Sequence, residues 1–160
     1  MGPGSLRHDR CMARIHIREF HDDDLDAVVR LWWQASSAAE QPVYSLAEVT
    51  ASCREDHAVV AMRDDEVVAV AVGRAAHAQG WIVFFGIAED ARSADVSGGL
   101  LDALERKMAP LGLSMLSVLL PEGSRIDLLT SNGFQLRHSL RYLERQMPVQ
   151  RRELDLLKDV

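Results

Sequence analysis

Residue types that define other protein classes are scarce in this sequence. Cysteine occurs only at Cys11 and Cys53, with no CxxC pair and no short-spaced histidine partners. This usage predicts free thiols in a reducing cytoplasm, rather than a disulfide framework or a zinc site. No apolar run approaches the roughly 20 residues that a bilayer crossing needs, so we expect neither a membrane span nor a membrane partner.

Positive charge is also in short supply. The chain has 18 Lys and Arg residues and 24 Asp and Glu residues, which gives a formal net charge of −6. Binding to a phosphate backbone needs clustered positive charge, so this balance argues against a nucleic-acid partner. It mildly favours a basic partner such as an amine.

The length of the chain is that of one domain. Its 160 residues, 48% of them hydrophobic, are enough to bury a substantial core. We assign residues 1–11 to a tag remnant with a disordered N-terminus and residues 12–147 to the domain. Residues 148–160 are charged and carry leucines, a pattern that fits either a short amphipathic helix against a neighbour or a loose C-terminal tail.

The first half of the domain alternates strand and helix patterns. The acidic triplet at residues 22–24 suits a solvated helix cap, because carboxylates oppose the helix dipole. Ser45 and Glu48 have the spacing of a capping box at the start of a second helix. The predicted elements are a strand at residues 14–18, helices from residue 22 to 35 and from 45 to 55, and strands at 58–62 and 67–72 joined by a tight turn at Asp64-Asp65.

The second half predicts an alternation of buried strands and helices. An almost wholly apolar run at residues 81–87 is typical of a strand buried on both faces. Asn132-Gly133 forms a helix stop. The predicted elements are strands at residues 81–87, 113–120 and 134–142, with helices at 94–109 and 124–131. This order predicts an α/β domain (α+β in its mixed sheet) with helices on both faces of a central sheet.

Two stretches of this half carry a family resemblance. Residues 85–92 read FGIAEDAR, and the helix that follows contains LLDALE at residues 100–105. Gly133-Phe134 is a second landmark after the short helix. The domain resembles the GNAT superfamily of N-acetyltransferases, in which an apolar strand and a short turn precede R/Q-x-x-G-x-G/A at the start of a helix. The resemblance implies a GNAT-like acyl-CoA N-acyltransferase fold, with acetyl-CoA or another acyl-CoA as co-substrate.

The resemblance also implies which residues bind the cofactor. A helix N-terminus presents unpaired N–H groups and partial positive charge to a pyrophosphate, and a splayed strand leaves backbone groups free for pantetheine amides. The implied cofactor-binding residues are Gly86, Ile87 and Ala88 on the strand, and Arg92, Ser93, Ala94, Ser97 and Gly98 at the helix start. Gly86 within a strand further suggests a bulge or a close backbone approach.

The motif differs from the family pattern at both glycines. Asp95 and Ser97 stand where the glycines belong, and a carboxylate near a pyrophosphate repels it. Gly98 and Gly99 follow inside the helical pattern. They fit either close packing of the helix on the sheet or a shifted approach of the cofactor.

Acetyl transfer to an amine needs a base and often an acid. Glu89, at the end of the buried strand, is the nearest candidate for the base, and His57 and His77 are looser ones. Many GNAT enzymes use a tyrosine as the general acid, and the corresponding position here is Leu129, which cannot donate a proton.

The resemblance therefore implies direct transfer of an acetyl group to a primary amine of an unidentified small molecule or peptide. The alternative is a catalytically inactive GNAT-like domain that serves as a binding or assembly module, which Asp95 and Leu129 favour. The family and the leucine-bearing tail make a homodimer plausible.

Overall fold

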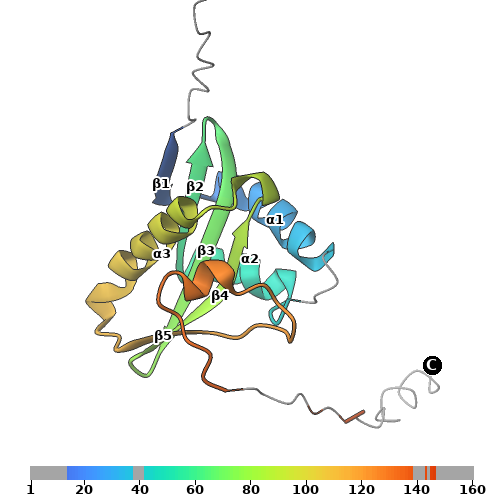
Figure 1. Cartoon of the computed structure of the whole chain (residues 1–160), viewed down its shortest axis with the longest axis vertical. Helices are drawn as coiled ribbons and strands as arrows, with labels where there is room; N and C mark the ends of the chain where they lie inside the picture. Colours follow the sequence, from blue (N-terminus) through green and yellow to red (C-terminus); the bar gives the residue numbers. More distant parts are fainter. Residues whose placement is uncertain (1–13, 38–41, 139–142, 144, 147–160) are drawn as a thin grey trace, which may run out of the picture.

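A computed structural model of the chain describes residues 14–37, 42–138, 143 and 145–146. The predicted remnant at residues 1–11 and the predicted tail at residues 148–160 lie outside these ranges. The described residues form a five-stranded sheet in the order β1-β2-β3-β4-β5 (Figure 1). The strands are β1 (Ile15–Glu19), β2 (His57–Arg63), β3 (Glu66–Ala76), β4 (Gln79–Ile87) and β5 (Met115–Val118).

Helices cover both faces of this sheet (Figure 1). On one face α1 and α2 pack through Val28, Leu31 and Val49, and on the other α3 packs through Leu100 and Leu104. The helices are α1 (Leu25–Ser37), α2 (Leu46–Glu55), α3 (Ala94–Met108) and α4 (Asp127–Thr130), with 3-10 turns η1 (Asp22–Asp24), η2 (Glu89–Ala91) and η3 (Ala109–Leu111). None of these helices is both long and apolar enough to cross a membrane.

The pairing of the strands confirms the predicted mixed sheet. Neighbouring strands from β1 to β4 run antiparallel, and β4 and β5 run parallel. The tight turn between β2 and β3 forms without glycine because Asp64 takes the left-handed conformation, with φ of 54°. The capping box of α2 is also present, since Ser45 Oγ accepts the Glu48 amide and Glu48 Oε2 accepts the Ser45 amide.

The thiol of Cys53 belongs to the core between the sheet and α1 and α2. Burial raises its pKa to about 12, so the thiol stays protonated at neutral pH. Cys53 is a free cysteine, as its spacing predicts. Cys11 lies outside the described residues.

The last elements are shorter than predicted. β5 ends at Val118 and is half-exposed, because it forms the edge of the sheet instead of a buried strand. The helix predicted at residues 124–131 is reduced to α4. The predicted strand at residues 134–142 is absent from its described part, residues 134–138, and the rest of it lies outside the described residues. Alternation alone does not make a strand where the sheet offers no paired neighbour.

An ion pair joins the end of β1 to η1, the turn that precedes α1. Arg18 donates from Nη1 and Nη2 to the two carboxylate oxygens of Asp24 at 2.7 and 2.8 Å. Asp24 also accepts the amide of His21 at 2.8 Å and is 5% exposed. The hydrogen bonds from Arg18 hold the pKa of this carboxyl below its usual range. The acidic triplet is therefore not wholly a solvated cap, since its last member is buried and paired.

Asp24→Asn should lower the free energy of unfolding by about 2 kcal/mol, because the amide keeps the bond from His21 but loses the charged pair. The pKa of Asp24 is lowered in the folded protein. Its contribution is thus present above the unfolded value of about 3.9 and lost as the pH falls through the lower folded value. Urea unfolding from about pH 7 to about pH 3 should show the difference between the two proteins shrinking.

Asp22→Asn is the matched control for this measurement. Asp22 is exposed and lies 3.5 Å from Arg54, a surface pair that contributes little to stability. An equal loss of stability in the two variants would contradict a special role for Asp24.

Candidate active site

β4 and β5 pair over a short stretch only. Their parallel register ends where Ile82 lies opposite Val118. β5 stops at that residue, whereas β4 continues to Ile87. From residue 83 onward β4 is paired with β3 on one side, and its other edge faces no strand of the described residues. This part of β4, residues 83–87, is called the open edge below.

A β-bulge marks the point at which the two strands part. On β3, Val72 lies opposite Phe84, but the next residue, Gly73, lies opposite Ile82. Val83 is therefore the extra residue, and it packs with Phe84 in the same core beside α1 and α2. A bulge bends its strand and increases the local twist. The bend is thus at Val83, not at Gly86 as the glycine suggests.

The hydrogen-bond alternation of β4 decides which backbone groups face the open edge. The Ala88 amide donates to the Val68 carbonyl of β3 at 2.8 Å, and the Ala88 carbonyl accepts an amide of η2 at 2.9 Å. Alternate residues of a strand bond to the same neighbour, so Gly86 also bonds toward β3. Phe85 and Ile87 direct their N–H and C=O groups to the open edge. Of the predicted pantetheine contacts Gly86, Ile87 and Ala88, only Ile87 directs both its N–H and its C=O to the open edge.

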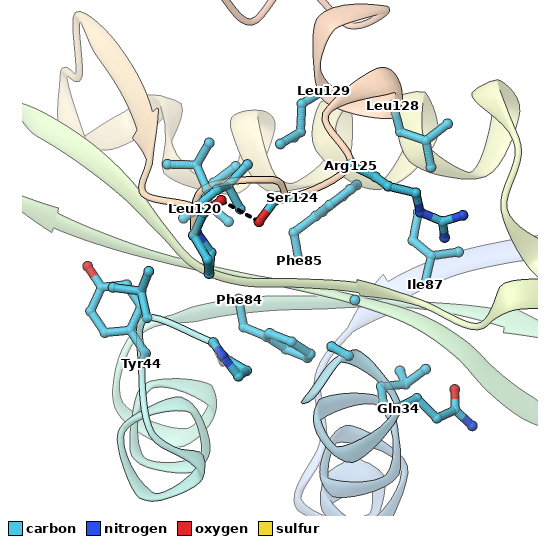
Figure 2. A pocket seen from close by; sticks show the side chains of 18 of the residues that line it. Gln34, Tyr44, Phe84, Phe85, Ile87, Leu120, Ser124, Arg125, Leu128 and Leu129 are labelled. Carbon is cyan, nitrogen blue, oxygen red and sulfur yellow. Dashed lines mark hydrogen bonds between the residues drawn. The ribbon is translucent and has the colours of Figure 1, made fainter. Parts of the chain in front are cut away.

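A cleft of about 820 Å³ lies along the open edge. Figure 2 shows how β4 divides its lining: Phe84 points to the side of α1 and Tyr44, and Phe85 points to the side of α4. The predicted site residues that line the cleft are Gly86, Ile87, Ala88, Glu89 and Arg92. Ser93, Ala94, Ser97 and Gly98 belong to the start of α3 instead.

Gly86 leaves room for the side chain of Phe84, which lies two residues earlier on the same strand. A Cβ atom at this position would lie 2.6 Å from Cζ of Phe84 and 3.5 Å from Cβ of Leu31. The ring of Phe84 therefore lies over the glycine, where any other residue would displace it. The neighbour at Gly86 is thus an aromatic side chain, and the close backbone approach expected there stays a prediction.

The amino end of α3 follows directly on η2. Ser93 is the N-cap, since its Oγ accepts the Val96 amide at 3.2 Å and its carbonyl accepts the Ser97 amide at 3.1 Å. The amides of Ala94 and Asp95, in the first turn, precede any intrahelical acceptor. These two N–H groups are the ones that an anion at this helix end would meet.

Ser97 is fully buried rather than presented to the cleft. Its Oγ donates to the Ala94 carbonyl at 3.2 Å and accepts a hydrogen bond from Asn132 Nδ2, also at 3.2 Å. The hydroxyl thus ties α3 to the turn after α4. This placement argues against the predicted contact between Ser97 and a cofactor.

The two glycines inside α3 differ in their surroundings. A Cβ at Gly99 would lie 2.7 Å from Cδ1 of Ile17 on β1, which favours the reading of close packing on the sheet. A Cβ at Gly98 would meet only Asn132 Oδ1, at 3.1 Å. A cofactor contact at Gly98 stays a prediction.

Charges of both signs surround the end of the cleft nearest α3. Arg92 is partly buried, and its Nη2 lies 3.4 Å from Oδ1 of the exposed Asp127. Asp95 is exposed in the first turn of α3, where it opposes the helix dipole. A phosphate at this helix end would meet one arginine and two carboxylates. These side chains together make the site less favourable for a phosphate than the helix N-terminus would be alone.

Glu89 forms a bidentate ion pair with Arg125 at the mouth of the cleft. Arg125 Nη2 lies 2.9 Å from Glu89 Oε2 and 3.2 Å from Oε1. These hydrogen bonds lower the pKa of the Glu89 carboxyl. A general base works best with a pKa near the working pH, so Arg125 keeps Glu89 ionised but weakens it as a base. The neighbouring Asp90 also pairs with an arginine, through a single hydrogen bond from Arg63 Nη2 at 2.7 Å.

The other catalytic candidates lie elsewhere. Leu129 is buried in the wall of the cleft, so the usual tyrosine position carries an apolar side chain that donates nothing. His57 opens β2 and His77 sits in the turn between β3 and β4, with φ of 50°. Neither histidine lines the cleft.

Several lining residues had no signal in the sequence. Gln34 on α1, Tyr44 before α2 and Arg125 before α4 reach the cleft from segments far apart in the chain (Figure 2). Their convergence depends on the packing of α1 and α4 on opposite sides of β4. A spacing motif would not reveal it.

Known proteins resemble this chain in structure more than in sequence. No protein-family profile and no curated protein matches the sequence. The structure is similar to N-acetylglutamate synthase from Neisseria gonorrhoeae complexed with coenzyme A and N-acetyl-glutamate, with a TM-score of 0.65 and 19% identity. That alignment covers 92% of this chain and 33% of the synthase, so the chain spans about a third of the length of that protein.

Two further structures match over most of their own length. Rv2747 from Mycobacterium tuberculosis, in complex with CoA, has a TM-score of 0.61 at 16% identity over 91% of this chain and 82% of its own. An aminoglycoside acetyltransferase from an uncultured soil metagenomic sample, in complex with sisomicin, has a TM-score of 0.60 at 10% identity. Its alignment covers 84% of this chain and 97% of that protein.

These likenesses confirm the fold expected from residues 85–105. The chain has the single-domain fold of the GNAT N-acetyltransferases, with a mixed sheet that opens between β4 and β5.

Gly86→Ala should destabilise the protein by about 1–3 kcal/mol, because the new Cβ forces the Phe84 ring out of its place. The midpoint of urea unfolding measures this loss. In a Phe84→Leu background the clash is relieved, so Gly86→Ala should cost less than half as much there. Equal costs in the two backgrounds would show that the ring is not what excludes a side chain at this position.

Proposed function

We propose that this protein is an acyl-CoA-dependent N-acetyltransferase that transfers an acetyl group directly to a primary amine of a small molecule or peptide. The observation that carries the proposal is the open edge of β4, which leads through η2 to the amino end of α3. The similar structures support it, since the synthase and Rv2747 hold CoA and others are aminoglycoside acetyltransferases. Acetyl-CoA would supply the acetyl group as a thioester.

The residues at the open edge fit a pantetheine chain. Ile87 and Phe85 present N–H and C=O groups to the cleft, which complement the amides of that chain. Gly86 and Ala88 would contribute shape to the same wall rather than hydrogen bonds, because their backbone groups bond toward β3 and η2.

The start of α3 would hold the pyrophosphate. The first-turn amides, beginning at Ala94, supply N–H donors, Ser93 fixes the helix start, and Gly98 would line the approach. Arg92 would add a charge-assisted hydrogen bond. It would exchange its contact with Asp127 for the phosphate, and a single 3.4 Å contact to an exposed carboxylate opposes this only weakly.

The cleft would bring the two reactants together from opposite sides of β4. The N–H groups at the open edge can donate to the oxygen on which charge develops during transfer, and their fixed geometry needs no reorganisation. Holding amine and thioester in one cleft supplies a further part of the rate by orientation.

Glu89 would accept the proton of the amine, through a bridging water. It is ionised at neutral pH, and the bonds from Arg125 lower its pKa below the usual range of a glutamate. An ionised carboxylate at the mouth of the cleft also attracts the ammonium form of the acceptor. A cytoplasmic location and a homodimer belong to the same proposal. The location rests on the free thiols, and the homodimer rests on the family resemblance and the leucine-bearing tail.

A second candidate function is binding without transfer. Leu129 at the usual acid position and the weakened basicity of Glu89 favour it, and so does the charge of Asp95 at the phosphate end. Such a domain would bind its ligand or assemble with a partner while releasing no coenzyme A thiol from acetyl-CoA.

Coenzyme A at about 100 times its Kd should raise the free energy of unfolding by about 2.7 kcal/mol, measured as an increase in Tm. Arg92→Gln should weaken binding about tenfold through loss of the charged contact. Asp95→Asn should tighten binding, because it removes a negative charge from the same helix end.

Arg106→Gln is the control for these two variants, since Arg106 lies exposed toward the other end of α3. The absence of any shift at about millimolar coenzyme A would overturn the proposed function, because a pantetheine site of ordinary affinity saturates there. Unchanged binding in Asp95→Asn would instead place the phosphate away from the first turn.

Glu89→Gln should lower kcat about 100-fold if Glu89 is the base, and it should leave coenzyme A binding unchanged. Because the pKa of Glu89 is lowered, its ionised form persists down to acid pH. The rate of the native enzyme should therefore show no loss attributable to Glu89 above about pH 5. Asp90→Asn, the adjacent exposed carboxylate, is the control and should keep the native rate. Equal rates for native and Glu89→Gln protein would assign the proton to solvent.

A further inference from the structure

The cleft has a distinct compartment on the α1 and α2 side of β4. Its walls come from α1, from the segment before α2 and from β4, and Figure 2 shows Phe84, Tyr44 and Gln34 around it. This is the side opposite α4, where Phe85, Leu128 and Leu129 lie (Figure 2). The compartment is lined by Leu31, Gln34, Ala35, Val43, Tyr44 and Phe84.

These walls are apolar and held in place by their neighbours. Phe84 lies over Gly86, and Leu31 is buried beside it. The indole N–H of Trp32 on α1 donates to the Tyr44 carbonyl at 3.2 Å, which ties the segment before α2 to α1. Val43 in that segment is 48% exposed and lines the cleft. Such walls favour an apolar body over a hydrated one.

Negative charge in the cleft is confined to its mouth. Among the described residues that line the cleft, the carboxylates are Glu89 and Asp90, which follow the end of β4. Each is bonded to an arginine, Glu89 to Arg125 at 2.9 Å and Asp90 to Arg63 at 2.7 Å. The described walls beside α1 and α2 carry no carboxylate, so their polar side chains are the neutral Gln34 and Tyr44.

This distribution of charge discriminates between classes of amine. A polyamine or an aminoglycoside carries several ammonium groups, and each would lose hydration against the apolar walls, whose described residues offer no carboxylate to replace it. A monoamine has a single ammonium, which can remain near Glu89, while its body lies against Ala35, Val43 and the edge of Phe84. Burial of that body supplies binding energy in proportion to its apolar area.

Resting on the proposed function, we infer that the acceptor is a primary monoamine with an apolar aromatic or aliphatic body, and that polycationic amines are poor acceptors. The compartment beside Phe84, Ala35 and Val43 receives the body. The reaction forms an amide bond between the acceptor nitrogen and the acetyl carbon and breaks the thioester bond. One ammonium proton passes to solvent through Glu89, and the second proton that the nitrogen loses protonates the departing thiolate, so that coenzyme A leaves as the thiol.

The inference is tested first by a homologous series of acceptors. With saturating acetyl-CoA, kcat/KM for propylamine, butylamine, pentylamine and hexylamine should rise about fourfold per methylene, since each buried methylene adds a fixed increment of binding. Phenethylamine should exceed spermidine and neamine by at least tenfold, measured as release of coenzyme A thiol. A flat series, or a preference for spermidine or neamine, overturns the inference.

A charge placed in the compartment should reverse this preference. Val43→Asp adds a carboxylate at a half-exposed position that the fold tolerates, so phenethylamine should lose about tenfold in kcat/KM and spermidine should gain. Leu111→Asp is the matched control, an apolar residue of 45% exposure on η3 that does not line the cleft, and it should leave the preference unchanged. The same loss for both amines in Val43→Asp would contradict the role of the compartment.

Binding separates the failure of the inference from that of the proposed function. Tm is measured with coenzyme A alone, with phenethylamine alone and with both. If coenzyme A raises Tm, and phenethylamine raises it neither alone nor beyond the value with coenzyme A, the acceptor class is rejected and the cofactor site is retained. Stabilisation by phenethylamine alone supports the compartment and rejects the cofactor site, and no stabilisation by either rejects both.

Discussion

The separation of β4 from β5 is the constraint on which the candidate site depends. The strands pair only as far as Ile82 and Val118, and the bulge at Val83 bends β4 at the same point. If β4 were fully paired, its backbone groups would bond to a neighbouring strand, and that strand would fill the space that is now the cleft. The open edge therefore supplies both the cavity and the polar groups that face into it.

The second determinant of the site is the balance of charge around this opening. Arginines and carboxylates alternate at its mouth, so that Arg92 faces Asp127 and Arg125 faces Glu89. These pairs are exposed enough to exchange partners at small cost. They keep the mouth nearly neutral, while the walls beside α1 and α2 remain apolar. The chemistry of the cleft thus changes along β4 from charged at its end to apolar at Phe84.

The sequence determined the elements of the fold through local rules. Alternation predicts β1, the apolar run predicts β4, and the helical spacing of Val96, Leu100 and Leu104 predicts α3. Each of these patterns is read within a few residues and survives in any packing that buries the same face. The capping box of α2 belongs to the same class, because both of its hydrogen bonds form within one turn.

Local patterns failed where the outcome depends on a distant partner. The alternation at residues 134–138 predicts a strand, yet these residues form none, since pairing depends on a neighbour that the pattern does not encode. The last aspartate of the acidic triplet reads as a solvated cap, yet it is buried because Arg18 of β1 reaches it.

The same distinction between local signals and distant contacts applies to the candidate site. The sequence by itself determined that a strand, a turn with Arg92 and a helix starting at Ser93 follow one another, because these are contiguous and have local signals. Only the tertiary structure decided that Ser97 is buried against Asn132, that Arg125 holds Glu89, and that Phe84 lies over Gly86 beside Leu31. Those contacts join residues from separate elements, and the free energy that selects them comes from packing the whole sheet between its helices.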